Sequence, residues 1–174
     1  LFKLSSDYVA EDKSTQMFFA ETQNKLLYAV TYHTAAEIVM ERADAQKQNM
    51  GLTSWKGSIV RKQDVIIAKN YLSNEELDKL NRLVTIFLES AELRVKERKD
   101  LTIDFWRKNV DSMLSFQGQE VLSGKGSISN QQMEKQVMLI YDKFDKRRKA
   151  FDAAEADRQD MLELRELEEK IKHR

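Results

Sequence analysis

The sequence predicts an all-α fold, an irregular helical bundle with a long projecting C-terminal helix. Proline is absent and only five of the 174 residues are glycine, so long stretches can be helical without interruption. Apolar residues also recur at three- and four-residue steps, as they do on the buried face of a helix. With 41% hydrophobic residues the chain can bury one modest core, which indicates a single domain.

The composition argues against several kinds of site. Lysine plus arginine equals aspartate plus glutamate at 29 each, so no global field attracts nucleic acid or an anionic membrane. Without cysteine the chain can form no disulfide and no thiolate metal site, which fits a cytoplasmic protein. No apolar run approaches the about 20 residues that span a bilayer, and we expect no membrane association. Because the chain begins with Leu1 and residues 1–4 resemble the end of an upstream element, we expect a fragment of a longer protein.

Periodicity and capping signals place the individual helices. We expect helices over residues 14–32, 35–43, 63–72, 74–99, 103–118 and 130–174. Their N-terminal caps are Thr34, Ser73 with Glu76, Thr102, and Ser129 with Gln132. The short helix over 63–72 would bury Val65, Ile66 and Ile67.

The composition of the last helix changes along its length. Its first part carries apolar residues at helical spacing, whereas alternating charges dominate after Asp145. We therefore expect a helical core domain over residues 1–151 and a charged helical extension over 152–174. Leu164, Leu167 and Ile171 suit a short coiled-coil seam on that extension.

Four polar residues fall near one stripe of the second helix: His33, Glu37, Glu41 and Asp44. Such a stripe can bind a divalent cation through carboxylates or pair a general base with an acid. The alternative is a solvated face, with His33 forming a hydrogen bond at the helix start. With one useful histidine and no cysteine, we expect no zinc site and no metal.

Residues 44–62 form the longest irregular segment, and loops of this length are often functional. The loop contains Asn49-Met50-Gly51-Leu52-Thr53-Ser54-Trp55-Lys56-Gly57-Ser58. The charges from residue 45 to residue 72 are Lys47, Lys56, Arg61, Lys62 and Lys69 against Asp64. The glycine spacing does not match a phosphate-binding loop. Trp55 can stack a base beside these cations, or it can pack into the core and hold the loop.

The densest basic run is Lys143, Lys146, Arg147, Arg148 and Lys149. It can contact phosphate or an acidic partner. The neighbouring Asp142, Asp145 and Asp152 favour an ordinary solvated helix surface instead.

Three further stretches are distinctive when taken together. They are Tyr32-His33-Thr34-Ala35-Ala36-Glu37-Ile38 through Arg42-Ala43-Asp44, Asn49 through Gly57, and Ile67-Ala68-Lys69-Asn70-Tyr71-Leu72 with Leu80-Asn81-Arg82. In their order and spacing they resemble the RhuM family of virulence-associated bacterial proteins. The resemblance implies that a phage-type DNA-binding domain of the KilA/Bro kind often precedes this region. Two positions depart from the family pattern: Gln48 stands where relatives often have proline, and Asp104 lies one place earlier than the usual Asp-Trp pair.

The first functional hypothesis is an interaction and assembly domain that needs no cofactor. Its C-terminal helix would join copies or a protein partner, and the region itself would bind nucleic acid weakly or not at all. The alternative is an enzyme acting on phosphodiester or nucleotide substrates. The candidate cluster for a functional site is His33, Glu37, Glu41, Asp44, Asn49, Trp55, Lys56, Arg61, Lys69 and Asn70.

The enzyme hypothesis requires the loop to close over the acidic stripe of the second helix in one concave site. A purely structural alternative brings the same elements together, with Glu37 or Glu41 pairing with Lys56 or Arg61 to hold the loop. Catalytic residues cannot be assigned from the sequence.

Overall fold

The computed structural model describes residues 5–97 and 101–172, and this part of the chain is all-α, as predicted. Its helices are α1 Lys13–Thr31, α2 Ala35–Arg42, α3 Asn74–Lys96, α4 Ile103–Phe116 and α5 Asn130–Lys172, with short 3₁₀ turns η2 Gln48–Gly51 and η3 Ala68–Tyr71. The residues expected to end an upstream element, 1–4, and the predicted helix ends at Lys99 and Arg174 lie outside the described residues.

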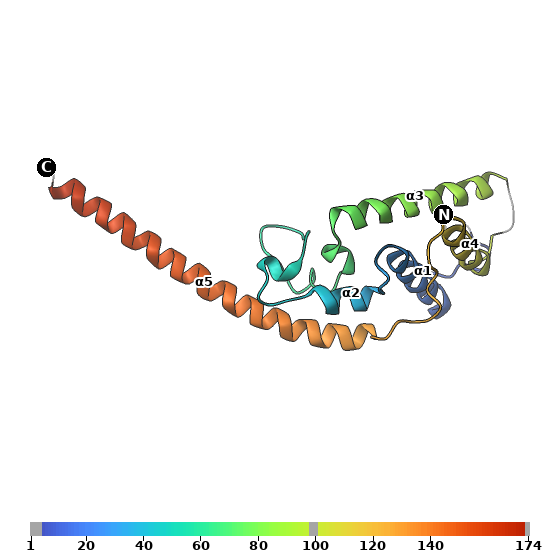
Figure 1. Ribbon diagram of the computed structural model, residues 1–174, viewed down its shortest axis with the longest axis horizontal. Helices are drawn as coiled ribbons and strands as arrows, with labels where there is room; N and C mark the ends of the chain where they lie inside the picture. The colour runs from blue at the N-terminus through green and yellow to red at the C-terminus, as the bar shows by residue number, and fades with distance from the viewer. Residues whose placement is uncertain (1–4, 98–100, 173–174) are drawn as a thin grey trace.

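The helices form an elongated molecule rather than a symmetric bundle (Figure 1). α1, α3 and α4 pack at one end, while α2 lies between them and α5. At that end the buried ring of Trp106 meets Phe87 edge-on at 6.0 Å. The Trp106 indole also donates a hydrogen bond of 2.8 Å to the Ser5 hydroxyl, so the segment before α1 is held against α4.

Four of the predicted helix starts are confirmed. Helix capping involves residues within one turn of each other, so it can be recognised from the sequence alone. Ser73 and Glu76 form the reciprocal box at the start of α3, and Thr102 caps α4. Thr34 and Glu37 form a further box at α2. Ser129 and Gln132 exchange hydrogen bonds of 3.0 and 3.2 Å before α5.

The predicted helix over residues 63–72 is wrong. The structure has turns there, with η3 as the one helical piece, and Ile67 is 45% exposed although Val65 is fully buried. The Asp64 carboxylate accepts a hydrogen bond from the Arg61 amide, and the Asn70 side chain donates to the Asp64 carbonyl. Such side-chain bonds offer the backbone an alternative to the helix.

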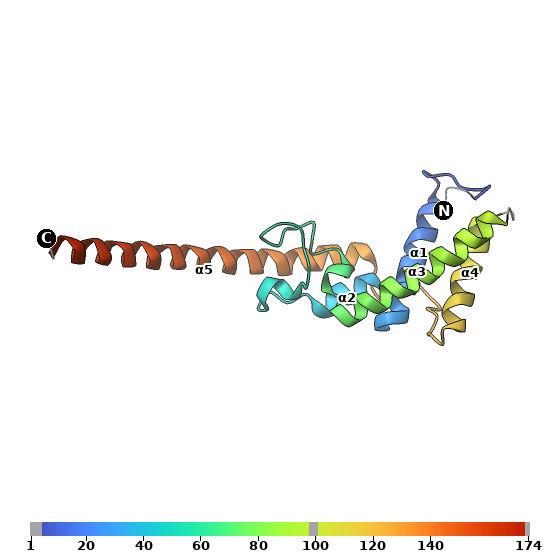
Figure 2. The ribbon, with the colours of Figure 1, turned by 90° about the horizontal axis from the view of Figure 1, so that it is seen from above.

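α5 is anchored over its first part only. Met133, Val137, Tyr141 and Phe144 are buried against the rest of the chain. Beyond Arg148 almost every residue is exposed, and Figure 2 shows this part of the helix projecting away from the other elements. Phe151, the last residue of the predicted core domain, is itself 67% exposed.

In residues 5–97 and 101–172, no helix is both long enough and apolar enough to cross a bilayer.

Candidate functional site

Glu37, at the first turn of α2, is a central hydrogen-bond acceptor. One carboxylate oxygen accepts from the amide and hydroxyl of Thr34, both at 2.8 Å. The other accepts from the amide and hydroxyl of Ser127, at 2.6 and 2.7 Å. The carboxylate thus joins the start of α2 to the connection between α4 and α5.

The same hydrogen bonds set the charge of this side chain. Burial alone raises the pKa of Glu37, but the bonds from Ser127 and Thr34 outweigh it and lower the pKa from 4.5 to about 2. A carboxylate held this firmly in its charged form is a weak base. Glu37 is therefore suited to holding the chain rather than to accepting a proton.

Gly126 allows the neighbouring Ser127 to reach the Glu37 carboxylate, and neither residue was among the candidates for the site. Gly126 has a φ of +79°, in the left-handed region that favours glycine. A Cβ atom at this position would lie 2.6 Å from Cγ2 of Thr34. The glycine-rich turn was visible in the sequence, but nothing in it indicated that the turn packs on α2.

His33 and Glu41 line an open depression of about 640 Å³ on this side of α2. Its other walls come from Tyr28 and Tyr32 on one side and from residues 126–128 on the other. The His33 Nδ1 atom lies 2.7 Å from the Thr31 carbonyl, so that nitrogen carries the donated hydrogen. Its Nε2 atom is 3.7 Å from the Glu41 carboxylate, beyond hydrogen-bond distance.

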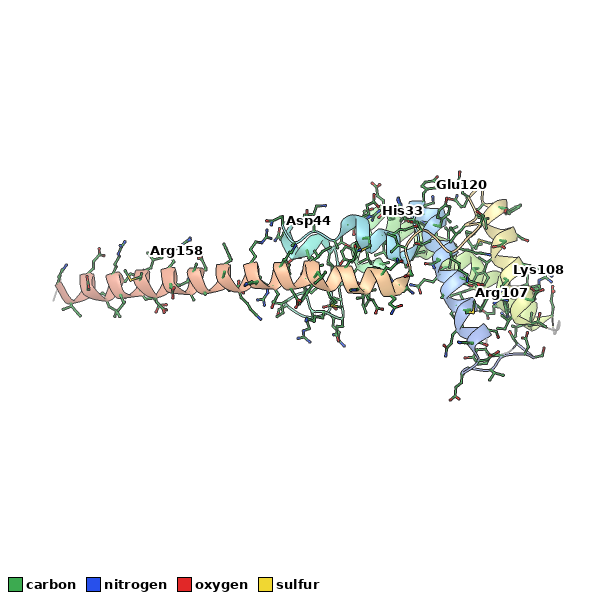
Figure 3. All side chains as sticks on the ribbon, turned by 90° about the horizontal axis from the view of Figure 1, so that it is seen from below. His33, Asp44, Arg107, Lys108, Glu120 and Arg158 are labelled. Carbon is green, nitrogen blue, oxygen red and sulfur yellow. The ribbon has the colours of Figure 1, made fainter. Side chains whose placement is uncertain are left out.

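Asp44 follows the other end of α2, and Figure 3 shows it well apart from His33 along the molecule. Its carboxylate accepts a hydrogen bond of 2.8 Å from the Gln46 amide and so stabilises a turn. The Asp44 amide donates to the Met50 carbonyl at 3.2 Å. Asp44 is therefore not part of a continuous acidic stripe with His33.

Asn49, Met50 and Gly51 form a run of left-handed residues at the start of the loop, with φ of 51°, 59° and 84°. Met50 is fully buried, and a Cβ on Gly51 would lie 2.5 Å from the Arg42 carbonyl. Non-glycine residues hold this conformation only where their surroundings fix it. Asn49 thus serves a turn that places Met50 in the core.

Asn70 closes the base of the loop. Its carbonyl accepts hydrogen bonds from the amide and hydroxyl of Thr53, at 2.7 and 3.0 Å. Its side chain donates to the Asp64 carbonyl at 2.9 Å. The one hydrogen of the Thr53 hydroxyl is shared between the Asn70 carbonyl and the Leu72 carbonyl, which is the nearer at 2.7 Å. Two family-like stretches are therefore bonded to each other.

Arg42 belongs to the first of the three family-like stretches and is bonded to the end of the third. Its guanidinium forms two hydrogen bonds with the Glu76 carboxylate, at 2.6 and 2.7 Å, and a third with the Tyr71 carbonyl at 3.0 Å. This arginine holds the pKa of Glu76 below its usual value. The stretches that carry the family resemblance therefore meet at the end of α2 and hold one another in place.

The other loop candidates do not converge on the acidic residues. Trp55 is half-buried against the core, with no hydrogen-bond partner for its buried Nε1 among the described residues. Lys56, Arg61 and Lys69 are exposed.

α5 holds the loop from the opposite side. Arg147 donates to the carbonyl and side-chain oxygens of Gln46, at 2.8 and 2.7 Å. The Tyr141 hydroxyl donates to the Val60 carbonyl at 3.3 Å. Part of the predicted basic run therefore serves the fold.

The prediction that the α2 stripe and the following loop form one site is not supported by this geometry. Glu37 and the depression face residues 126–128, whereas the loop packs at the far end of α2 and on α5. Within the part of the chain that the structure describes, no ion pair joins Glu37 or Glu41 to Lys56 or Arg61. The pairing that we considered as the structural alternative is absent there as well. Over the same residues, no group of three or more His, Cys, Asp and Glu could hold a metal ion.

Comparison with known proteins gives one family. The model of the family described as Virulence protein RhuM family matches residues 1–152. No curated protein and no solved structure matches the chain. The match covers all three quoted stretches and ends inside α5.

Proposed function

We propose that this chain, which belongs to the Virulence protein RhuM family by a match over residues 1–152, is an interaction and assembly domain that acts through α5. The packed part, with α1 to α4 and the loop, supplies a stable base. The outer part of α5 binds another helix. Assembly would position a DNA-binding domain of the kind that the family resemblance implies upstream.

The observation that carries this proposal is the exposure of large apolar side chains on the projecting helix. Leu164 is 57% exposed, Leu167 55% and Ile171 74%. They are spaced as on a coiled-coil seam, and a helix that projects from the core gains stability when such a seam is covered. In contrast, the charged candidates around α2 bond within the chain.

No observation favours the alternative enzyme acting on phosphodiester or nucleotide substrates. That hypothesis needs the acidic stripe and the basic loop in one concave site. In the described residues, His33, Glu37 and Glu41 line a depression with the connection before α5, and the exposed Lys56 and Arg61 are not among its lining residues.

Light scattering tests the proposal directly. At high micromolar concentration, the full chain should have more than the mass of one chain, while a chain ending at Phe151 should be monomeric. Since the buried residues of α5 all precede Phe151, the shorter chain keeps its core. If both proteins are monomeric, the outer helix is only a solvated extension and the proposal is wrong.

A pair of single substitutions separates the seam from general surface effects. Leu164 and Leu162 are exposed to similar extents, 57% and 52%, but lie on different faces of the helix. Leu164→Glu should abolish association, and Leu162→Glu should leave it nearly unchanged.

A further inference from the structure

We propose that the helix bound by α5 is α5 of a second copy, running antiparallel, with Ala150 of one chain opposite Ala153 of the other. This inference rests on the proposed assembly function. It adds the identity of the partner, its direction and its register.

One line of exposed residues runs along most of α5. Starting at Leu139 and alternating steps of four and three residues, it passes through Ala150 and Ala153 and ends at Ile171. We call this line the outer seam. Steps of four and three residues keep a line on one face of a supercoiled helix. All residues of the outer seam are exposed.

The outer seam is free even where α5 packs on the rest of the chain. Between residues 133 and 144 the buried positions are Met133, Val137, Tyr141 and Phe144, whereas Leu139 is 61% exposed. Figure 1 shows α2 and the loop on one side of this part of α5 and no other element on the opposite side. A second helix can therefore lie along the inner as well as the outer part of α5.

The outer seam carries two pairs of like charges. Lys143 and Lys146 lie three residues apart, as do Asp157 and Asp160, and each pair repels itself within an isolated helix. The two pairs have opposite signs and lie at equal distances on either side of Ala150 and Ala153.

These four charges differ from their neighbours off the seam. Arg148 pairs with Asp145 and Asp152 at 2.7 and 2.8 Å, and Arg158 pairs with Glu155 at 3.3 Å. Within the described residues, no ion pair includes any of the four seam charges. Several charges near the middle of α5 are thus paired within the helix, whereas these four are available to an external partner.

In an antiparallel dimer, all four seam charges would be paired with opposite charges at once. With Ala150 opposite Ala153, Lys146 faces Asp157 and Lys143 faces Asp160 of the other chain. The same register places Leu139 opposite Leu164, and the two-fold symmetry repeats each contact. A parallel pair would instead place lysine on lysine and aspartate on aspartate, which is unfavourable. The charges therefore select both the direction and the register.

Cysteine cross-linking tests the register, because the natural chain contains no cysteine. Lys143→Cys and Asp160→Cys proteins are prepared separately, and then mixed and allowed to exchange subunits. In the proposed dimer the two sulfurs of each single variant are separated by about 25 Å at 1.5 Å per residue, so neither forms a disulfide alone. The mixture should form disulfide-linked dimers.

Exchanging two opposite charges of the outer seam provides an independent test that uses one variant at a time. Lys146→Asp alone and Asp157→Lys alone should each weaken dimerisation by about tenfold or more, because each creates like charges across the seam. The double variant should regain most of the wild-type affinity. A generally weaker helix would not recover in this way.

The outcomes separate this inference from the proposed function. Disulfides in each single variant alone, with a dimeric mass, would show a parallel dimer and overturn the inference while keeping assembly through α5. A dimeric mass without any disulfide, together with no recovery in the double variant, would do the same. A monomeric wild-type chain would overturn both.

Discussion

The segment around α2 and the outer part of α5 are both rich in charged residues, but they use them in different ways. Around α2, Arg42 pairs with Glu76, and Glu37 is bonded to Thr34 and Ser127 within the same chain. On the outer seam, Lys146 and Asp157 belong to no ion pair that the described residues form. Charges that are satisfied internally fix a fold, whereas unpaired charges at regular spacing are suited to a second chain. Family-like motifs therefore do not by themselves mark a functional site.

The largest effect on stability is expected from removing the Arg42 side chain, which bonds to Glu76 and Tyr71. Its side chain is 25% exposed and that of Glu76 is 23% exposed. Arg42→Ala should lower the free energy of unfolding by about 3 kcal/mol, because it leaves a partly buried carboxylate without its partner. Urea denaturation measures this change. Arg82→Ala, which breaks an exposed pair with Asp78, is the matched control and should cost about 0.5 kcal/mol or less. Equal losses of stability in the two variants would show that the Arg42–Glu76 pair contributes no more than an exposed ion pair.

The next effect concerns the turn that packs on α2. Gly126→Ala should destabilise the fold by about 2 kcal/mol, because the residue is left-handed and its Cβ would clash with Thr34. A Cβ on Gly124 meets nothing within 4 Å, so Gly124→Ala should change stability by about 0.5 kcal/mol or less. Thermal unfolding of both variants compares them. A neutral Gly126→Ala would show that the turn is not held against α2.

Titration of Glu37 has a smaller effect that depends on pH. Since its pKa in the folded protein is lowered from 4.5 to about 2, its stabilising contribution is present above pH 4.5 and is lost as the pH falls toward 2. Glu37→Gln should therefore cost about 1 kcal/mol at neutral pH and progressively less in acid. Denaturant titrations over this pH range measure the difference. Glu41→Gln serves as the exposed control, and a pH-independent cost at Glu37 would argue against a bound carboxylate.

The smallest effect is expected from removing the outer helix. A chain ending at Phe151 should have nearly the same free energy of unfolding at low protein concentration, within about 0.5 kcal/mol, because the lost residues are exposed. As the concentration rises, the melting temperature of the full chain should increase and that of the shorter chain should not. A large loss of stability at low concentration would mean that the outer helix supports the core.

The fold class, most helix limits and the anchoring of α5 followed from local signals. Capping residues such as Ser73 and Thr102 bond within one turn of the helix, so their role can be recognised from the neighbouring residues in the sequence. The helix predicted over 63–72 failed because Asp64 and Asn70 bond to the backbone nearby, which hydrophobic periodicity does not register.

The candidate site was predicted less well than the fold. Glu37 was named as a candidate from its place on the helix, but its partner Ser127 lies 90 positions along the chain and has no distinctive local pattern. Asn49 and Asn70 were grouped with it because they lie in the stretches that resemble the RhuM family, although each serves the loop. The seam residues Leu164, Leu167 and Ile171 were visible from their spacing, whereas the freedom of the opposite face near Leu139 required the packed structure.

The half-anchored state of α5 has a consequence for how its backbone opens. Residues 133–144 are held by tertiary packing, whereas the helix beyond Arg148 has only its own hydrogen bonds. Isolated helical segments are marginal in water and fray from their ends. In a single chain, amide hydrogen exchange along α5 should therefore quicken steadily from the anchored part outward. In an antiparallel pair the same amides would exchange at a nearly uniform slow rate, because each frayed part would lie against the anchored part of the other chain.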